Sequence, residues 1–276
     1  MLECFNNPNH AIPADWSDPS GYRCAKTHNS GLTMVIDKGT GLSAFRDTLE
    51  LAAPYIDICK LGFGTTALYP PDVLQHKLQL AKMYGLHIMP GGTFFEIALR
   101  KTTSLSFMKT IAKLGFNAVE ISDGTFPLSA QLRREAIVAG VEAGLTVYTE
   151  FGKKTALYRA ERDELLETLS LDLAAGASHV IVEARESGTV GVFDQEGKFD
   201  EHFVLDIVEA AKANRDRLIW EAPQKEQQVS LIQTLGSNVH LGNIAYHDVL
   251  SVETLRRGLR GDTAVSLEKR SAAPCE

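Results

Sequence analysis

The chain has 276 residues, of which 44% are hydrophobic and 23% are charged. This composition is typical of a globular protein, and the length suffices for a large core without disulfide or metal cross-links. The formal net charge is −7, and no basic stripe stands out, which argues against nucleic acid as a main partner. A small anionic ligand must therefore be held by a local cluster of basic side chains.

Residues 1–28 are rich in Asn, Pro, Asp and Ser, which predicts an irregular N-terminal arm. The arm lacks the basic and apolar regions of a secretory signal, and no apolar run approaches the length of a membrane span. The four cysteines show no zinc-finger or redox-motif spacing, as expected in a reducing compartment. We therefore expect a cytoplasmic protein with no membrane partner.

After the arm, short apolar segments rich in β-branched residues alternate with segments of helical periodicity. The apolar segments are residues 32–37, 55–62, 86–92, 117–124, 145–152, 178–185, 217–223 and 239–245. Several helical segments end at a glycine that precedes the next apolar segment, which is the pattern of a helix C-cap leading into a strand. These glycines are Gly85, Gly115, Gly144 and Gly176.

Strand–helix alternation predicts a parallel sheet that is covered by helices on both faces. Eight units favour an α/β fold of the (β/α)8 TIM barrel type, formed as a single domain by residues 29–263, with 264–276 as a polar tail. A doubly wound open sheet is the alternative. However, no G-x-G-x-x-G motif follows the first strand, where the chain reads DKGTGL.

Acidic residues recur at the carboxyl ends of the predicted strands, which meet on one rim of a barrel. The glutamates among them are Glu120, Glu150, Glu183 and Glu221. Carboxylates this close cannot all stay ionised without a cation, and oxygen ligands suit Mg²⁺, so we predict a magnesium site. Three histidines fall at or near strand starts, at the opposite end of a barrel, and are interpreted as structural: His87, His179 and His240.

Basic residues at the same strand ends predict an anion pocket, formed by Lys38, Lys60, Lys153, Lys154 and Arg185. The glycine-containing loop 183–194, which includes Ser187 and Gly188, offers backbone N–H groups to a phosphate or carboxylate. Asn243 adds a polar group at the end of the last strand. Arg256 and Arg257 are candidates for phosphate binding, although solvation on a helix is the simpler interpretation.

The segment LTVYTEFGKKT contains a predicted strand that ends at Glu150 and is followed by the adjacent lysines Lys153 and Lys154. A lysine beside another cation has a lowered pKa and can exchange a proton near neutral pH. Together with Mg²⁺ this suits chemistry through an enediolate, in which the metal holds a substrate carboxylate and a lysine protonates the adjacent carbon. A Schiff-base aldolase that uses Lys60 or Lys154 is a weaker alternative.

Eight segments of the chain also match a known pattern: GLTMVIDKG, YIDICKLGFGTTALYP, PGGTFFEIA, GFNAVEISDG, YTEFGKK, VIVEARESG, IWEAPQKEQQV and VETLRRGLRGDT. In order and without large gaps over about residues 30–263, they resemble the phosphosulfolactate synthase family of coenzyme M biosynthesis. The resemblance implies a TIM barrel, a homo-oligomer, and Mg²⁺-dependent addition of sulfite to C3 of phosphoenolpyruvate, giving 2-phospho-3-sulfolactate.

The resemblance also implies that Lys154 is the proton donor. From the adjacent position of the two lysines, we expect Lys153 to contact an anion or to lower the pKa of Lys154. Family membership fixes the phosphoenolpyruvate site better than the second substrate, because one fold hosts many reactions. Two alternatives therefore stay open. One is the same site with another small nucleophile or acceptor, and the other is a non-catalytic, stress-associated barrel protein.

Overall fold

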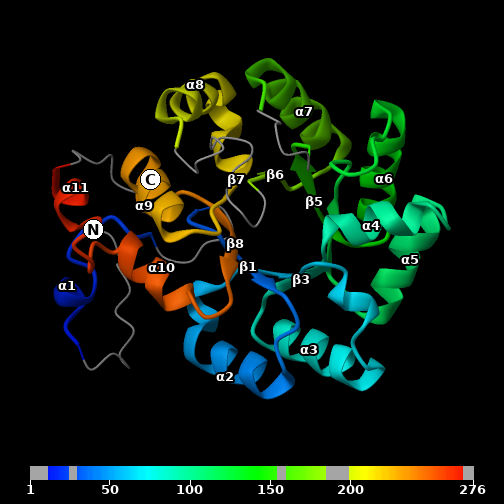
Figure 1. Cartoon of the computed structure of the whole chain (residues 1–276), viewed down its shortest axis with the longest axis horizontal. Helices are drawn as coiled ribbons and strands as arrows, with labels where there is room; N and C mark the ends of the chain where they lie inside the picture. The colour runs from blue at the N-terminus through cyan, green and yellow to red at the C-terminus, as the bar shows by residue number, and fades with distance from the viewer. Residues whose placement is uncertain (1–11, 25–29, 154–159, 185–198, 270–276) are drawn as a thin grey trace.

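The computed structural model describes residues 12–24, 30–153, 160–184 and 199–269 of the chain. Eight parallel strands form a nearly closed barrel with helices around it, which is the predicted (β/α)8 fold in a single domain (Figure 1). The predicted residues Lys154, Arg185, Ser187 and Gly188 lie outside the described ranges.

All eight predicted strands are present, and each is shorter than the apolar segment that predicted it. The strands are β1 (Thr33–Asp37), β2 (Ile58–Leu61), β3 (His87–Pro90), β4 (Ala118–Ile121), β5 (Thr146–Phe151), β6 (His179–Val182), β7 (Leu218–Glu221) and β8 (Leu241–Ala245). Their order in the sheet is β3-β2-β1-β8-β7-β6-β5-β4, so consecutive strands are neighbours and β1 pairs with β8. The parallel ladders require the long helical crossovers that the sequence pattern predicted.

The barrel closes where β3 and β4, the two ends of the sheet order, lie against each other. Asn117, directly before β4, joins this seam with its side-chain amide. Its Oδ1 accepts a hydrogen bond from the Ile88 N–H at 2.7 Å, and its Nδ2 donates to the Leu86 carbonyl at 2.9 Å. The side chain thus supplies hydrogen bonds that a ladder supplies elsewhere.

Helices cover the outside of the barrel (Figure 1). They are α2 (Leu42–Ala52), α3 (Pro71–Met83), α4 (Gly92–Leu99), α5 (Ser104–Leu114), α6 (Ala130–Glu142), α7 (Arg162–Ala175), α8 (Glu201–Ala211), α9 (Lys225–Leu235) and α10 (Val249–Arg256), with short 3-10 turns η1 (Ala53–Tyr55), η2 (Thr65–Ala67) and η3 (Lys212–Arg217). The glycine stop signals are confirmed, because Gly85, Gly115, Gly144 and Gly176 adopt φ values of 70°, 110°, 76° and 111°.

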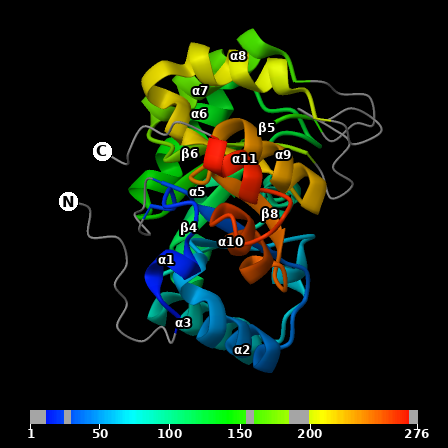
Figure 2. The same cartoon turned by 90° about the vertical axis from the view of Figure 1, so that its left-hand side faces the viewer.

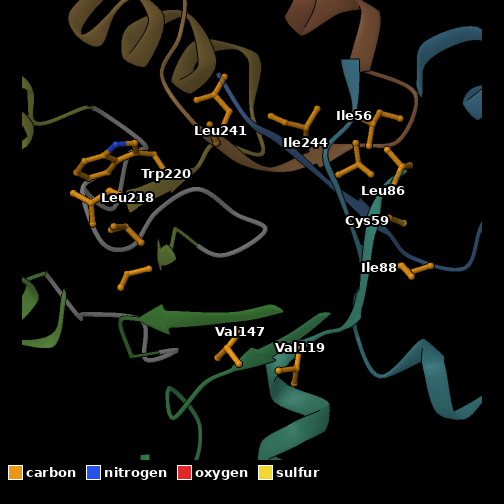
Figure 3. Packing of buried hydrophobic residues seen from close by; sticks show 14 of the residues in the cluster. Ile56, Cys59, Leu86, Ile88, Val119, Val147, Leu218, Trp220, Leu241 and Ile244 are labelled. Atoms are coloured by element: carbon orange, nitrogen blue, oxygen red, sulfur yellow. The ribbon is translucent and has the colours of Figure 1, made fainter. Parts of the chain in front are cut away.

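Alternating residues on each strand form two apolar layers. The outer layer packs between strands and helices and includes Val119, Val147 and Trp220 (Figure 3). The inner layer fills the barrel itself with Leu32, Met34, Ile58, Met89, Ala118, Tyr148, Ile181 and Ile219. A strand residue two positions beyond an inner-layer residue points into the barrel as well, but closer to its carboxyl-terminal mouth.

The chain ends differ in detail from the predicted arm and tail. The arm contains the short helix α1 (Ala14–Ser17), and Arg23 forms an ion pair with Glu253 of α10 at 3.2 Å. The segment expected to be a tail begins with α11 (Ala264–Lys269), in which Leu267 is buried in the core, and Figure 2 shows α11 beside α10. None of the helices in the described ranges combines the length and the apolar character of a membrane span.

Candidate active site

Four charged side chains lie inside the barrel at the carboxyl-terminal ends of their strands: Lys60, Glu120, Glu150 and Glu221. Each follows an inner-layer residue by two positions on the same strand, so the pleat directs it inward. All four residues are buried, with 5% or less of each residue exposed. We call this set the mouth cluster.

Lys60 is the cation of the mouth cluster. Its Nζ donates to Glu120 Oε1 at 2.9 Å and to Glu221 Oε1 at 3.0 Å, which joins β2 to strands β4 and β7 across the barrel. Burial alone lowers the pKa of Lys60, but the charges of Glu120, Glu221 and Glu150 outweigh it and hold the pKa well above the ordinary value. Lys60 therefore stays protonated.

The second oxygens of two glutamates are held by backbone groups. Glu221 Oε2 accepts from the Ala184 N–H at 3.1 Å, and Glu120 Oε2 accepts from the N–H of Gly92, at the start of α4. Gly92 comes so close to β4 that a Cβ there would lie 2.5 Å from Ser122 Cβ. The sequence prediction continued a strand through this glycine, whereas the chain turns here and starts a helix.

Glu150 is positioned through Ser122, which the sequence analysis did not single out. The Ser122 hydroxyl lies 2.9 Å from Glu150 Oε1 and also hydrogen-bonds to Glu96 Oε1. Glu96 in turn accepts from the backbone N–H groups of Thr125 and Phe126, at 2.8 and 2.6 Å. Ser122 follows Glu120 by two residues, so strand alternation was a signal that both side chains face the same side.

Arg133 of α6 fixes the end of β5. Its guanidinium donates to the Glu150 carbonyl at 3.0 Å, to Asp172 of α7 at 2.6 to 3.1 Å, and to Asp123 at 2.9 Å. Burial lowers the pKa of Arg133, but the hydrogen bonds and charges of these partners raise it overall. A buried charged network therefore holds the backbone that carries Glu150.

Three glutamates of the mouth cluster are suitably arranged to hold a divalent ion. One carboxylate oxygen from each of Glu120, Glu150 and Glu221 lies within 4.8 Å of the other two. Mg²⁺ prefers oxygen ligands at about 2.0–2.1 Å, so two opposite ligands lie about 4 Å apart and two adjacent ligands about 3 Å apart. The three oxygens must therefore move closer together to bind the ion directly. Lys60 leaves a formal charge of −2 on the four residues, which one divalent ion neutralises.

The other predicted site residues in the described ranges surround this cluster at different depths. Glu183 is buried just beyond β6, and Asn243 is buried within β8. Lys38 and Lys153 are exposed after β1 and β5, and the Lys38 ammonium lies 5.3 Å from the centroid of the Phe63 ring. Of the three described lysines that were predicted to form the anion pocket, Lys60 lies inside the barrel, whereas Lys38 and Lys153 are exposed.

Arg256 corrects one expectation. It is fully buried rather than solvated, and it donates to the carbonyls of Ser237 and Val239 at 2.7 Å and of Leu32 at 3.2 Å. These carbonyls lie at or before the starts of strands, so Arg256 stabilises the end of the barrel opposite the mouth cluster. Arg257 pairs with Glu253 at 2.7 Å.

The predicted structural histidines also lie at the amino-terminal end of the strands. His87 Nδ1 lies 2.6 Å from the Tyr148 hydroxyl, and the rings of His179 and His240 are 5.6 Å apart. His240 Nδ1 accepts from the Leu32 N–H at 2.9 Å. These contacts support the structural interpretation, because they join strands to one another far from the mouth cluster.

Comparison with known proteins gives a consistent result. Residues 21–262 match the family model described as (2R)-phospho-3-sulfolactate synthase. The chain is 45% identical to the phosphosulfolactate synthase of Methanocaldococcus jannaschii over 84% of this chain and 93% of that protein. It is 40% identical to that of Methanothermobacter thermautotrophicus, over 87% of this chain and 94% of the relative.

A solved structure shares the fold at much lower sequence identity. The 3-hexulose-6-phosphate synthase of Salmonella typhimurium is 14% identical to this chain, with a TM-score of 0.51, covering 86% of this chain and 95% of that one. At this identity the likeness concerns the barrel alone.

Proposed function

Because this chain belongs to the phosphosulfolactate synthase family, we propose that it adds sulfite to phosphoenolpyruvate in the mouth of the barrel, giving 2-phospho-3-sulfolactate. The observation that carries the proposal is the mouth cluster, a buried set of three glutamates and one lysine at the end of the barrel where active sites form. On this proposal the binding partners of the chain are two small anionic substrates, phosphoenolpyruvate and sulfite.

The reaction is an addition in which no group leaves. The sulfur lone pair of sulfite forms a bond to C3 of phosphoenolpyruvate, and the electron pair of the carbon–carbon double bond moves toward the carboxylate. C2 then takes up one proton, and the phosphate ester is retained. The protein must therefore hold the carboxylate, stabilise the charge that develops on it, and deliver a proton to C2.

We assign the metal to Glu120, Glu150 and Glu221. Glu183, which is buried just beyond β6, is kept as the fourth proposed ligand. Mg²⁺ bound there supplies positive charge next to the substrate carboxylate. Hydrogen bonds from Lys60 fix the positions of the Glu120 and Glu221 carboxylates, and a hydrogen bond from Ser122 fixes the position of the Glu150 carboxylate. Such fixed groups need little reorganisation during the reaction, which is the main source of electrostatic catalysis.

The basic residues of the rim are assigned to anion binding and proton transfer. Lys38 and Lys153 are exposed at the ends of β1 and β5, where they can meet an incoming anion. Lys154 is assigned as the donor of the proton to C2, with Arg185 and the loop residues Ser187 and Gly188 as further anion contacts. These last four residues lie outside the described ranges. Lys154 is assigned on the family resemblance, and Arg185, Ser187 and Gly188 on their position in the sequence after the sixth strand.

The experiment is to combine purified protein with phosphoenolpyruvate, sulfite and Mg²⁺ and to follow the reaction by phosphorus NMR. We expect the phosphoenolpyruvate signal to be replaced by that of a new phosphate ester, without inorganic phosphate, and we expect EDTA to stop the reaction. Binding of phosphoenolpyruvate without turnover would reject sulfite as the second substrate and keep the site.

Two single substitutions test the assignment of the lysines. Lys154→Ala is expected to abolish turnover while phosphoenolpyruvate binding, measured by calorimetry, stays within a few-fold. Lys153→Ala is expected to weaken binding of the anion and to leave measurable turnover. The opposite result would show that the roles of the two lysines are reversed.

A further inference from the structure

The strand β8 contains an irregularity at Asn243. Thr33 of β1 pairs with Leu241, but Val35 pairs with Ile244, so two steps along β1 correspond to three along β8. Asn243 has a φ of 54°, in the left-handed region, which residues other than glycine adopt infrequently. This is a β-bulge, and bulges near active sites commonly redirect one side chain.

The bulge directs Asn243 toward the mouth of the barrel. Leu241 and Ile244 on either side both belong to the outer apolar layer. Gly242 faces inward, since a Cβ there would lie 2.7 Å from Met34 Cε and 3.5 Å from Glu221 Cγ. Asn243 is the extra residue between Gly242, which faces inward and pairs with Glu221 of β7, and the outward Ile244. We infer from this register that its side chain shares the inner side with Gly242, near Glu221.

The Asn243 amide is buried without being satisfied. The residue is only 8% exposed, and its Oδ1 has no hydrogen-bond partner among the residues that the structure describes. A buried polar group without a partner is costly. A left-handed backbone is a smaller cost here, because Asn tolerates this region better than most residues other than glycine. Two such costs at one position, at the catalytic end of the barrel, point to a ligand that completes the site.

We propose that the Asn243 side chain binds an anionic oxygen of a substrate, so that its hydrogen bonds are completed only in the complex; this inference rests on the proposed function. Rotation of the amide by 180° exchanges its oxygen and nitrogen, so the NH₂ group can face the ligand. A neutral donor suits this position. A lysine or arginine beside Glu221 would pair with that carboxylate instead, as Lys60 does.

The shared chemistry, an oxyanion, occurs in both substrates. Phosphoenolpyruvate presents carboxylate and phosphate oxygens, and sulfite presents three equivalent oxygens. The two sources are distinguished by measuring KM separately for each substrate, because loss of a binding contact raises the KM of the substrate that made it.

The test compares three variants that separate the backbone role of Asn243 from its side-chain role. Asn243→Gly removes the amide and favours the left-handed backbone, so its Tm should match or exceed that of the wild type. Asn243→Ala removes the amide and keeps the strain. Asn243→Asp keeps the shape and tolerance of the left-handed region but replaces the donor by an acceptor.

We expect Asn243→Gly to lower kcat/KM by about 10- to 100-fold, the value of one hydrogen bond to a charged group, mainly through the KM of one substrate. Asn243→Asp should lose more, because its carboxylate repels an oxyanion. Activity of Asn243→Gly within about twofold of the wild type would overturn the inference and leave a purely backbone role. An Asn243→Asp variant that binds Mg²⁺ more tightly and stays active would overturn it in favour of a metal ligand.

The wild-type protein serves as the control for the proposed function itself. If the wild type turns over both substrates and Asn243→Gly equals it, only this inference fails. If the wild type binds phosphoenolpyruvate but does not react with sulfite, calorimetry on the wild type and Asn243→Gly still decides the inference through the Kd for phosphoenolpyruvate. If the wild type binds neither substrate, the proposed function fails and this inference fails with it.

Discussion

Lys60 is buried between Glu120 and Glu221, so its charge is compensated by these two carboxylates and not by water. The negative charges of the two carboxylates are in turn compensated by Lys60. Replacing a buried ion-pair partner by an apolar residue leaves the other charges uncompensated, which costs about 3–5 kcal/mol. We predict that Lys60→Met lowers the free energy of unfolding by about this amount, measured by urea denaturation.

The matched control is Lys109→Met, since Lys109 is an exposed lysine on α5. Its free energy of unfolding should stay within about 0.5 kcal/mol of the wild type. Equal stability of the two variants would contradict the picture of Lys60 as the internal cation of the mouth cluster.

At the scale of single residues, the position at the carboxyl ends of predicted strands identified the glutamates, and strand alternation would also have indicated Ser122. The contacts of Glu96 were not predictable, because they depend on where the loop at Thr125 and Phe126 folds back onto α4. The inward turn of Asn243 was also hidden, because a bulge changes the register of a strand without leaving a mark in its hydrophobic pattern.

At the scale of elements, the turn from β3 into α4 determines the position of Glu120. A Cβ at Gly92 would overlap Ser122 Cβ and lie 3.1 Å from Glu120 Cγ. We predict that Gly92→Ala destabilises the protein by about 1–3 kcal/mol, as overpacking does, and that it lowers activity by moving the N–H that binds Glu120. Circular dichroism melting and the phosphorus NMR assay measure the two effects.

Gly261→Ala is the control for this variant, because a Cβ at Gly261 meets no atom within 4 Å. It should melt close to the wild type and keep full activity. If Gly92→Ala behaved like Gly261→Ala, the close approach of α4 to β4 would have no functional weight.

The Arg133 network joins α6, α7 and the end of β5. We predict that Arg133→Met costs about 3–5 kcal/mol of unfolding free energy, because Asp172 then stays buried without its partner. The adjacent Arg134 is exposed on the same helix, so Arg134→Met should change little in the same denaturation series. A small effect at Arg133 would mean that Asp172 finds water or another donor.

Among the elements, strands and glycine-capped helices were the most predictable, since periodicity and caps are local signals. The helix α4 was not predicted, because the Pro-Gly-Gly sequence after a strand indicates only a turn. Whether a helix follows that turn depends on tertiary packing. The burial of Arg256 was missed for a similar reason. Its partners are carbonyls at Ser237, Val239 and Leu32, which are distant or non-periodic in the sequence.

At the scale of the whole molecule, two buried histidines link stability to pH. Burial, with nearby His240, Arg217 and His87, lowers the pKa of His179 from 6.5 to about 3, and burial is also the main cause that lowers the pKa of His240 to about 4. In the unfolded chain these two histidines are therefore protonated near pH 6.5, whereas in the folded protein they are protonated only at about pH 4 or lower. Their contribution to stability is fully present above pH 6.5 and is lost as the pH falls.

We predict that His179→Gln flattens the dependence of unfolding free energy on pH between about 6 and 4, by about 1.4 kcal/mol per pH unit. The slope is the readout, so an overall loss of stability in the variant does not obscure it. His202→Gln is the control, because His202 is exposed on α8. An unchanged slope in His179→Gln would mean that His179 is protonated in the folded protein.

The barrel as a whole was predictable from eight repeats of one strand–helix pattern, because such a pattern has few ways to bury both faces of its sheet. The closed barrel was predicted over an open sheet, and the structure confirms it. The contacts at the β3–β4 seam were not predicted, because they depend on hydrogen bonds of the Asn117 side chain.

The most direct test is a crystal structure with phosphoenolpyruvate and Mg²⁺ bound. We predict density for both in the mouth of the barrel, with the metal in contact with at least two of Glu120, Glu150 and Glu221 and with the phosphoenolpyruvate carboxylate. Phosphoenolpyruvate bound at the other end of the barrel, or a metal held away from these glutamates, would contradict it.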